Sequence, residues 1–597
     1  MSQRYGWEPD GRTTIIINDQ TDFANGSATI VPNKVVTLYA TQPTETSGLE
    51  DYDDWLFAVL VHELAHIFHL DMAYGLPWIG RFPLGKYASM NLYTPAWIVE
   101  GFAVYEETVS SGAGRGRSSY VDMALRTAAL EDRFPGIDQG YRGFADWPFG
   151  NLAYFFGGRF QVWLASKFGE EALLHYHRAY ASDPIPYFTY LPAEIAFDQS
   201  LESLWNEWEA EVTREARSFA DKVRTSTTYQ PSVTRLTNYG GDLSGPRYSP
   251  DGKWILFSTD SPKDGSRMRR LPVKGGEDEV LVDDTFSKAV AFSPDGRALY
   301  FQQTEINQRY YLHNSLLRFD LDDGGAARLE IEKKSHDDFV APSGSLRARD
   351  PDVASDGFSI VFVQAPYGGN RLILANLGGK GGATLRSPKV IVPAAPDVQL
   401  SSPRFSPDGT LIALSRFQGG RRDILLYERS GKQVEEITRD RALDVDPTWS
   451  PDGKWLLFAS DRDGASNLYA HPMDGGPVRQ LTKLVTGAFQ PSVSPDGKSL
   501  VFRGYSADGF DVYQMAFEPE KAPIVSLPLA DPVARDATPR RLPAPNKGIP
   551  ALPPPVAQAA GEVPALDPTW TLDDYTSADT LLPFHDNWNL FPTAAVN

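Results

Sequence analysis

The sequence predicts a multidomain protein in which an α+β domain is followed by an all-β domain built from repeats. Residues 49–222 are mainly helical in pattern and rich in aromatic side chains, whereas short β runs and turns dominate from residue 223 onwards. A four-residue turn motif also recurs six times in this second part. Because the chain has 597 residues, each part is long enough to bury a core of its own.

Composition excludes several classes of function. The chain carries a net charge of −20, which disfavours nucleic acid and anionic lipid as partners. It contains no cysteine, so disulfides, thiolate nucleophiles and cysteine-bound zinc are excluded. The N-terminus has no apolar signal core, and no apolar run is long enough to span a membrane. A strand is predicted soon after the first residue, and a Pro-rich stretch comes before the last ones, which suggests a fragment or a misplaced start codon.

The first predicted element is a small β-sheet over residues 13–42. The β-rich runs Thr14–Ile17 and Val35–Tyr39 flank the turn signal Asn25-Gly26-Ser27. One edge of such a sheet can pair with the backbone of an extended ligand. A purely structural sheet is an equal alternative.

The next element is a helix that contains the pattern H-E-x-x-H at His62–His66. On a helix the two histidines lie one turn apart on one face, where both imidazoles can bind a single zinc ion beside the carboxylate of Glu63. The apolar run from Trp55 to Val61 leads into the motif, Ser47–Glu50 is typical of a capping box at the start, and Gly75 is a stop signal. The alternative is that the histidines are hydrogen-bonded core residues.

A zinc site needs a third protein ligand, and Glu100 is the better candidate. A metzincin would have glycine and histidine three and six residues after the second histidine, but these positions hold His69 and a methionine. Thr94 can cap a second helix and Pro95 suits its first turn, so Glu100 would be presented by that helix. His69 is the local rival, but it stands roughly 10 Å along the helix axis from His62, too far to share one ion. We expect His69 behind the ligands or in the pocket wall.

The two motifs together carry a family resemblance. His62-Glu63-x-x-His66 followed by Trp97-x-x-Glu100-Gly101-x-Ala103-x-Tyr105 resembles the gluzincin metallopeptidases, in particular the peptidase MA-like group, over roughly residues 10–215. The resemblance implies an α+β zincin-like fold, Zn²⁺ bound by His62, His66 and Glu100, and Glu63 as the general base. It also implies that the small sheet offers an edge to the substrate backbone. Tyr154 would face the metal and stabilise an oxyanion, with packing in the core as the alternative.

Two further features of the helical part are interpreted as structural. Gly112–Arg117 is glycine-rich, but no strand leads into it, so we predict a mobile surface loop and not a phosphate site. His175 and His177 are two residues apart and face different ways on a helix, so they make a poor ligand pair. We predict structural or surface roles for both.

The second domain is predicted to be a six-bladed β-propeller over residues 223–520. The turn motif Ser-Pro-Asp-Gly or a close variant occurs at Ser249–Gly252, Ser293–Gly296, Ala354–Gly357, Ser406–Gly409, Ser450–Gly453 and Ser494–Gly497. Successive aspartates are 44, 61, 52, 44 and 44 residues apart, which leaves room for about four strands per repeat. The repeats resemble the propeller of the TolB type. The third lacks the proline, and an insertion within residues 304–345 lengthens the second. Turn formation explains the aspartates better than calcium binding does.

The sequence therefore predicts three parts. Residues 1–222 form the first domain, with a β edge at 13–42 and a helical part at 49–222, and residues 223–520 form the propeller. Residues 521–597 are a Pro-rich linker and C-terminal tail. In bacterial proteins of similar domain order such a tail can lead into an outer-membrane β-barrel. That resemblance suggests a location in the cell envelope, although the barrel itself is absent from this chain.

The resulting functional hypothesis is a zinc metallopeptidase that hydrolyses peptide bonds in a peptide or protein substrate. Its propeller would bind the substrate or a partner protein, or restrict access to the site. The alternative is a cell-envelope binding or assembly scaffold, in which the propeller is the working part and the zinc site is degenerate. The intact Glu63 favours the peptidase, because a purely structural metal site has no need of a base.

Overall fold

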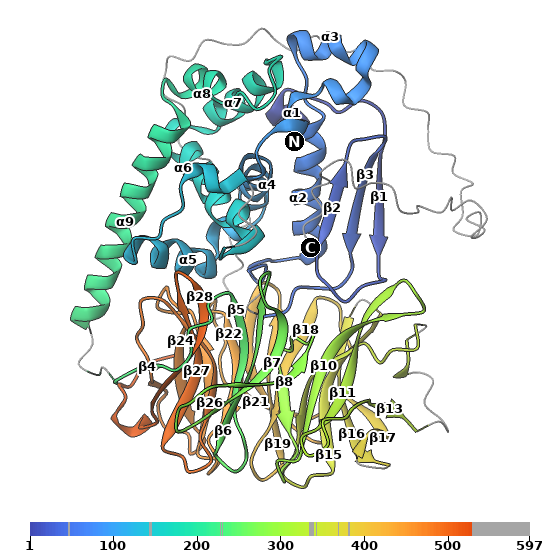
Figure 1. Cartoon of the computed structure of the whole chain (residues 1–597), viewed down its shortest axis with the longest axis vertical. Coiled ribbons are helices and arrows are strands. Elements are labelled where there is room, and N and C mark those ends of the chain that lie inside the picture. Colours follow the sequence, from blue (N-terminus) through green and yellow to red (C-terminus); the bar gives the residue numbers. More distant parts are fainter. Residues whose placement is uncertain are drawn as a thin grey trace.

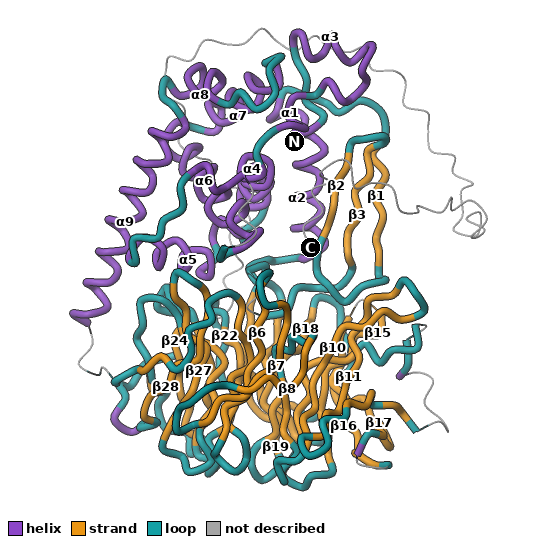
Figure 2. The backbone as a smooth tube through the Cα atoms, viewed as in Figure 1, coloured by secondary structure: helices purple, strands orange, loops and turns teal. Residues whose placement is uncertain are grey.

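The computed structural model describes residues 1–527, except for 46–47, 142–145, 227–228, 230, 333–338, 342, 368 and 380–381. Within these residues the helices gather at one end of the molecule and a large β domain forms the other end (Figure 1, Figure 2). The predicted linker and tail lie outside the described residues from residue 528 onwards. Among the described residues, no single helix is both long and apolar enough to cross a membrane.

The helical end of the molecule is built around two central helices. The α-helices are α1 (Ser2–Tyr5), α2 (Trp55–Leu70), α3 (Gly75–Leu84), α4 (Ala96–Ser110), α5 (Ser119–Leu130), α6 (Gly158–Phe168), α7 (Glu170–Ser182), α8 (Tyr190–Phe197) and α9 (Leu201–Ser226). Helices α2 and α4 pack against each other, and α6 covers α4 from the other side. Aromatic rings fill the core around α4 and α9, as in the contacts of Trp97 and Phe160 with Trp205.

A three-stranded sheet lies beside α2. Strands β1 (Thr13–Asn18), β2 (Gly26–Thr29) and β3 (Lys34–Tyr39) have the order β1-β3-β2, with β1 parallel and β2 antiparallel to β3. The predicted turn at Asn25-Gly26-Ser27 was wrong, because Gly26–Thr29 pair with β3 and form a strand of their own. Strand β2 is the edge of the sheet that lies next to α2 (Figure 1).

The boundaries of α2 differ from those predicted. The side chain of Asp54 accepts a hydrogen bond from the backbone N–H of Phe57 at 2.9 Å, so Asp54 and not Ser47 caps the helix; Ser47 itself is not described. Gly48 has a φ of +76°, which is incompatible with a right-handed helix that starts at the predicted capping box. The helix ends at Leu70, and the predicted stop, Gly75, instead opens α3.

The start of α4 is also shifted by one residue. Pro95 occupies the capping position that was predicted for Thr94, and the helix begins at Ala96. The hydroxyl of Thr94 donates to the carbonyl of Asn91 at 2.8 Å instead, at the end of a short 3₁₀ helix, η2 (Met90–Tyr93). The shift leaves Glu100 on the face that was expected.

Six antiparallel sheets form the β domain, in agreement with the six repeats. The first three contain β5 (Asp242–Tyr248), β6 (Trp254–Ser261), β7 (Gly265–Pro272) and β8 (Glu279–Asp283); β9 (Val290–Phe292), β10 (Ala298–Asn307), β11 (Tyr311–Asp320) and β12 (Ala326–Arg328); and β14 (Ala348–Val353), β15 (Ser359–Tyr367), β16 (Gly369–Gly378) and β17 (Thr384–Val392), to which β13 (Glu330–Ile331) adds a parallel strand.

The last three sheets complete a propeller. They contain β18 (Val398–Phe405), β19 (Leu411–Gln418), β20 (Arg421–Glu428) and β21 (Gln433–Glu436); β22 (Asp444–Trp449), β23 (Trp455–Ser460), β24 (Asn467–Pro472) and β25 (Arg479–Gln480); and β26 (Ala488–Val493), β27 (Ser499–Ser506) and β28 (Gly509–Ala516), to which β4 (Thr234–Arg235) adds the outer strand. Since β4 precedes the first sheet in sequence, it ties the start of the ring to its last blade. Asp511 supports this closure by accepting hydrogen bonds from Thr237 and from the backbone of Tyr239.

The repeated motif forms a tight turn between the first and second strands of each blade. At the first repeat the N–H of Gly252 donates to the carbonyl of Ser249 at 2.9 Å, and the Ser249 hydroxyl donates to Asp251 at 2.6 Å. The same carboxylate accepts from the N–H of Lys253 at 3.1 Å. Gly252 has a φ of +69°, which glycine adopts without strain. The aspartate therefore serves the turn itself, as predicted.

The propeller and the helical end share apolar surface. The ring of Tyr120 on α5 contacts Phe489 and Phe510 of the last blade, and Trp147 donates a hydrogen bond to the hydroxyl of Tyr505 at 2.8 Å. Buried residues from both parts belong to one continuous hydrophobic cluster. The two parts are therefore held together by packing as well as by the chain.

The insertion predicted within residues 304–345 makes a second contact. Part of it forms the long hairpin of β10 and β11, which reaches the small sheet (Figure 1). The N–H of Leu312 donates to the carbonyl of Gln20 at 2.9 Å, and the N–H of Asp22 donates back to Leu312 at 2.9 Å. Arg347 forms an ion pair with Asp22 at 2.8 Å. The insertion thus anchors the sheet on the propeller.

A third contact lies directly before α2. Gln399 donates to the carbonyl of Pro43 at 2.8 Å, and the buried carboxylate of Glu45 accepts hydrogen bonds from the hydroxyls of Ser401 and Ser402. The chain then continues into the wall of the cavity described below. The propeller therefore supports one side of that cavity.

Candidate metal centre

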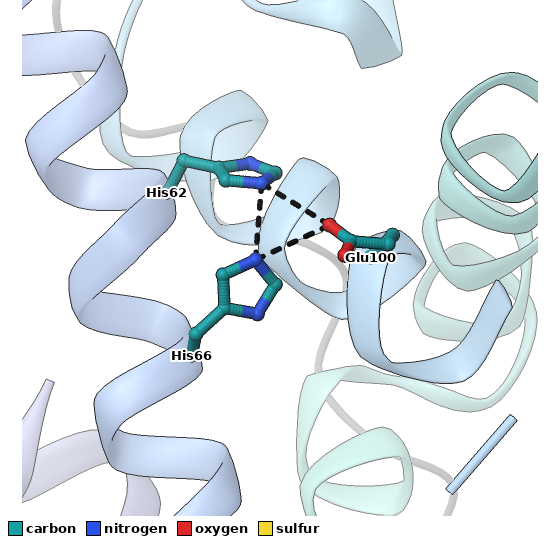
Figure 3. Close-up of side chains that lie close together, drawn as sticks. All are labelled: His62, His66 and Glu100. Atoms are coloured by element: carbon teal, nitrogen blue, oxygen red, sulfur yellow. Dashed lines mark hydrogen bonds and ion pairs between the residues drawn. The ribbon is translucent and has the colours of Figure 1, made fainter. Parts of the chain in front are cut away.

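Helices α2 and α4 bring three candidate ligands together (Figure 3). His62 and His66, from successive turns of α2, point to one side, and Glu100 of α4 faces them. The Nε2 atom of His66 lies 3.2 Å from Nε2 of His62 and 3.2 Å from Oε2 of Glu100, and Nε2 of His62 lies 3.4 Å from the same oxygen. All three side chains are buried.

This donor set fits a tetrahedral metal ion such as zinc. Two ligand atoms at about 2.0–2.1 Å from a tetrahedral ion are about 3.3 Å apart, close to the three observed distances. Within the described residues, Oε2 of Glu100 is buried and has no hydrogen bond of normal geometry, so it is an acceptor that a cation would satisfy. The three residues can therefore hold one metal ion.

Glu63 lies beside the three ligands without joining them. It is buried and lines a cavity of about 200 Å³ together with His62, His66 and Glu100. Burial raises the pKa of its carboxyl group, and the neighbouring histidines oppose that rise. Strand β2 approaches closely here, because a Cβ atom on Gly26 would lie 2.6 Å from Oε1 of Glu63. Glycine at this position therefore leaves room for the carboxylate.

Tyr154 also faces the site. It belongs to a single π-helical turn, η6 (Ala153–Gly157), which packs on α4 because Gly101 has no side chain; a Cβ there would lie 2.6 Å from the backbone of Gly157. The Tyr154 ring stacks on that of His62 with centroids 6.1 Å apart and lines the same cavity. Burial and the carboxylate of Glu100 raise the pKa of its hydroxyl well above the usual value, so the hydroxyl keeps its proton.

Two residues behind His62 were missed by the sequence analysis. Oε2 of Glu107 on α4 lies 3.2 Å from Nδ1 of His62, and Arg115 binds both carboxylate oxygens of Glu107 at 2.9 Å. Nη2 of Arg115 also lies 2.9 Å from the same Nδ1. This nitrogen either donates to Glu107 or accepts from Arg115, but cannot do both at once. When Nε2 binds a metal, Nδ1 carries the proton and donates to Glu107.

The electrostatics of His62 follow from this arrangement. Burial and Arg115 lower the pKa of His62, but the carboxylates of Glu100 and Glu107 outweigh them and raise it to about 9. Burial would raise the pKa of Glu107, but Arg115 holds it at about 2. Glu107 is therefore ionised and orients the imidazole.

The predicted mobile surface loop at Gly112–Arg117 was wrong. The loop contains a 3₁₀ turn, η3 (Arg115–Arg117), and its residues Gly114 and Gly116 are buried against α4. The buried bidentate ion pair of Arg115 with Glu107 holds the loop in place. The spacing of Glu107, two helical turns after Glu100, was the signal that could have identified it.

Glu107→Gln is expected to lower zinc affinity about 10- to 100-fold, because the carboxylate that orients His62 and raises its basicity is lost. Zinc titration of the metal-free protein measures this effect. Glu106→Gln is the matched control, since Glu106 is the adjacent buried carboxylate and pairs with Arg4 on another side of α4. Equal zinc affinity in the Glu107 variant and the wild type would contradict the assignment.

The other histidines of the helical part lie in its core. His69 is buried, and its Nε2 lies 3.1 Å from Nδ1 of His177, which in turn contacts Gln161. His69 is therefore part of the packed core. It does not line the cavity, so the expected position in the pocket wall was wrong. His175 is buried as well, so both it and His177 have the structural role that was predicted.

The fold and the site together define a multidomain protein, with an N-terminal helical region that holds a candidate metal centre and a C-terminal β-propeller. Residues 350–532 match the family model of the TolB beta propeller domain, so this part of the chain is a propeller of the TolB type, as the resemblance implied. Such a domain supports a role in binding or as a scaffold. The match does not extend to residues 1–349, and no curated protein matches the chain.

Several solved structures are similar to part of the chain. A putative TolB from Agrobacterium tumefaciens shares 22% identity, with 40% of this chain and 80% of the other covered and a TM-score of 0.32. TolB from Acinetobacter baumannii shares 16%, with 52% and 70% covered and a TM-score of 0.32. An oligogalacturonate lyase from Vibrio parahaemolyticus shares 16%, with 50% and 96% covered and the same TM-score. At this level, the similarity says nothing about the activity of the chain.

Proposed function

We propose that the protein is a zinc-dependent peptidase whose propeller binds the substrate or a partner protein. The observation that carries the proposal is the convergence of His62, His66 and Glu100 with a fourth group, Glu63, at the wall of one cavity. A zinc ion held by these three residues would keep one position for water, and Glu63 is a buried carboxylate that lines the same cavity. A purely structural metal site has no use for such a base.

In the proposed mechanism each residue has a separate task. Zn²⁺ held by His62, His66 and Glu100 would supply Lewis-acid chemistry, which polarises a carbonyl group and lowers the pKa of a water molecule. Glu63 accepts a proton from the water as its oxygen bonds to the carbonyl carbon, and passes that proton to the amine that leaves when the C–N bond breaks. Tyr154, which keeps its hydroxyl proton, donates a hydrogen bond to the oxygen that becomes negative in the transition state. Glu107 holds His62 in the orientation that binding requires.

Strand β2 supplies the proposed binding edge for the substrate backbone. It pairs with β3 along one side only, and residues 24–28 line the cavity. An extended peptide can add to this edge through backbone hydrogen bonds, which bring its carbonyl groups past the metal centre. Backbone recognition of this kind suits a peptide or protein substrate.

The experiment that tests the proposal is hydrolysis of a diverse peptide library by the purified zinc-loaded protein, followed by mass spectrometry. We expect cleavage that falls to background when zinc is removed with a chelator and returns when zinc is added back. Magnesium added to the chelated protein serves as the control, because its preference for octahedral oxygen sites does not suit two imidazoles. A zinc-loaded protein that cleaves no peptide would contradict the proposal.

A second candidate is a binding scaffold, which the match of residues 350–532 to the TolB beta propeller domain favours. In that case the propeller binds a protein partner in the cell envelope and the metal centre only stabilises the helical end. The two candidates differ in the role of Glu63, which only a peptidase needs.

A further inference from the structure

Helix α3 presents its apolar side chains to the outside of the protein. Phe82 is 97% exposed, although it belongs to an ordered helix. The exposed large apolar side chains of α3 and the following 3₁₀ helix, η1 (Gly85–Ala88), are Leu76, Trp78, Ile79, Phe82, Leu84 and Tyr87. A surface helix of a protein in water normally has polar residues on its outer face. The outer face of α3 is therefore suited to an apolar environment.

The charged residues of the same segment face the interior. Arg81, the one charged residue of α3, donates hydrogen bonds to the backbone carbonyl of Asp71 and, at 3.2 Å, to the hydroxyl of Ser89. Lys86 forms an ion pair with the fully buried carboxylate of Asp71 at 3.1 Å. Polar contacts thus hold the segment in place, and its apolar side chains are left outside. This arrangement is the reverse of an ordinary amphipathic surface helix.

A second apolar segment begins after α7 and continues into α8. Residues 184–193 contain no charged side chain. The exposed large apolar side chains here are Ile185, Tyr187, Phe188, Tyr190, Leu191 and Ile195. The segment is ordered by backbone contacts, because Asp183 accepts from the N–H of Ile185 at 2.9 Å and the N–H of Tyr187 donates to the hydroxyl of Tyr180 at 3.0 Å. Polar contacts therefore hold both segments in place while their large apolar side chains stay exposed.

The two segments form one surface, which we call the apical patch. The ring of Tyr93 lies 6.3 Å from that of Tyr187, and the hydroxyl of Tyr93 donates to the carbonyl of Tyr87 at 3.0 Å, so Tyr93 bridges them. Helices α3, α7 and α8 lie at the end of the molecule opposite the propeller (Figure 1). The patch is therefore continuous and far from the interface with the propeller.

We propose that the apical patch docks the protein on the surface of a lipid bilayer, with α3 and the segment before α8 in the interfacial layer. Aliphatic side chains mixed with tryptophan and tyrosine are the composition that enters this layer. Phe82 and Ile79 protrude, as insertion requires, whereas the charged residues Arg81, Lys86 and Glu194 are each partly buried. Because the chain has a net charge of −20, attraction to anionic lipid does not contribute, and the docking is hydrophobic.

Docking would also place the metal centre close to the bilayer. His66 lies four residues before the end of α2, about 6 Å along the helix axis, and α3 follows after a short turn. This consequence rests on the proposed peptidase function and favours polypeptide substrates held at the membrane surface. The docking itself does not depend on that function.

Flotation of the full chain with phosphatidylcholine vesicles tests the proposal. We expect the wild type to float with the vesicles, without further gain when phosphatidylglycerol is included. The double variant Ile79→Ser, Phe82→Ser should bind at least about tenfold more weakly, because two protruding apolar side chains are lost. The matched control is Ile306→Ser, Phe358→Ser, which removes an exposed isoleucine and phenylalanine from the propeller and should float like the wild type.

Zinc content and circular dichroism verify that both variants are folded, and neither readout depends on peptidase activity. The proposal is overturned if the wild type does not float with phosphatidylcholine, or if the patch variant floats as well as the control. It is also overturned if size-exclusion chromatography shows a dimer that the patch variant abolishes while no vesicle binding occurs, since a second copy would then cover the patch.

Discussion

Replacing Glu63 with glutamine is expected to leave the zinc content and the fold unchanged while peptide hydrolysis falls by about 10² to 10⁴. Glutamine has the shape of glutamate but cannot accept the proton of the attacking water. Because Glu63 lies beside the three ligands and is not one of them, the metal should remain. The measurement is kcat/KM on a peptide cleaved by the wild type, together with the zinc content of each protein.

Glu50→Gln is the matched control for this experiment. Glu50 is a buried carboxylate in the segment before α2, and burial raises its pKa as it does for Glu63. It does not line the metal cavity, so the control should keep full activity. If the Glu63 variant cleaves as fast as the wild type, the result contradicts the peptidase mechanism and favours the scaffold function.

The second large effect is expected at the ligands. His62→Ala, His66→Ala and Glu100→Ala should each abolish stoichiometric zinc binding, because two remaining ligands do not hold the ion. In the wild type, zinc at about 100 times its Kd should add about 2.7 kcal/mol to the free energy of unfolding, and the three variants should lose this increment. Metal analysis and denaturant unfolding with and without zinc measure both effects.

His69→Ala separates the metal site from the core behind it. His69 is buried on the same helix, but its ring faces His177 and not the ligands. The substitution should cost about 1–3 kcal/mol of stability, since His177 loses its partner, while zinc stays bound. Loss of zinc from His69→Ala with retention in Glu100→Ala would show that the wrong residue was assigned as the third ligand.

The parts of the site that could be predicted are those determined by local geometry. Residues four apart on a helix share a face wherever the helix lies, so His62 and His66 were predictable as a pair. The turn of each propeller repeat depends on the side chains of Ser, Asp and Gly within a few residues, so the number of blades could be predicted as well. In both cases the interactions join residues that are fewer than about ten positions apart in the chain.

The predictions of secondary structure were wrong where tertiary contacts oppose the local sequence signals. Asn25-Gly26-Ser27 has the composition of a turn, but pairing with β3 and the approach to Glu63 make it an edge strand. Ser47–Glu50 has the pattern of a capping box, but the positive φ of Gly48 keeps the helix from starting there. These segments take the conformation that their neighbours require.

The sequence by itself determined the HExxH helix, the second helix with Glu100, and six β repeats, because each follows from spacing along one stretch of chain. Only the tertiary structure decided that Glu107 and Arg115 hold His62, that β4 closes the propeller, and that α3 turns its charge inward and its apolar side chains outward. These features depend on contacts between segments far apart in sequence, and a periodic pattern shows which residues share a face but not what that face meets.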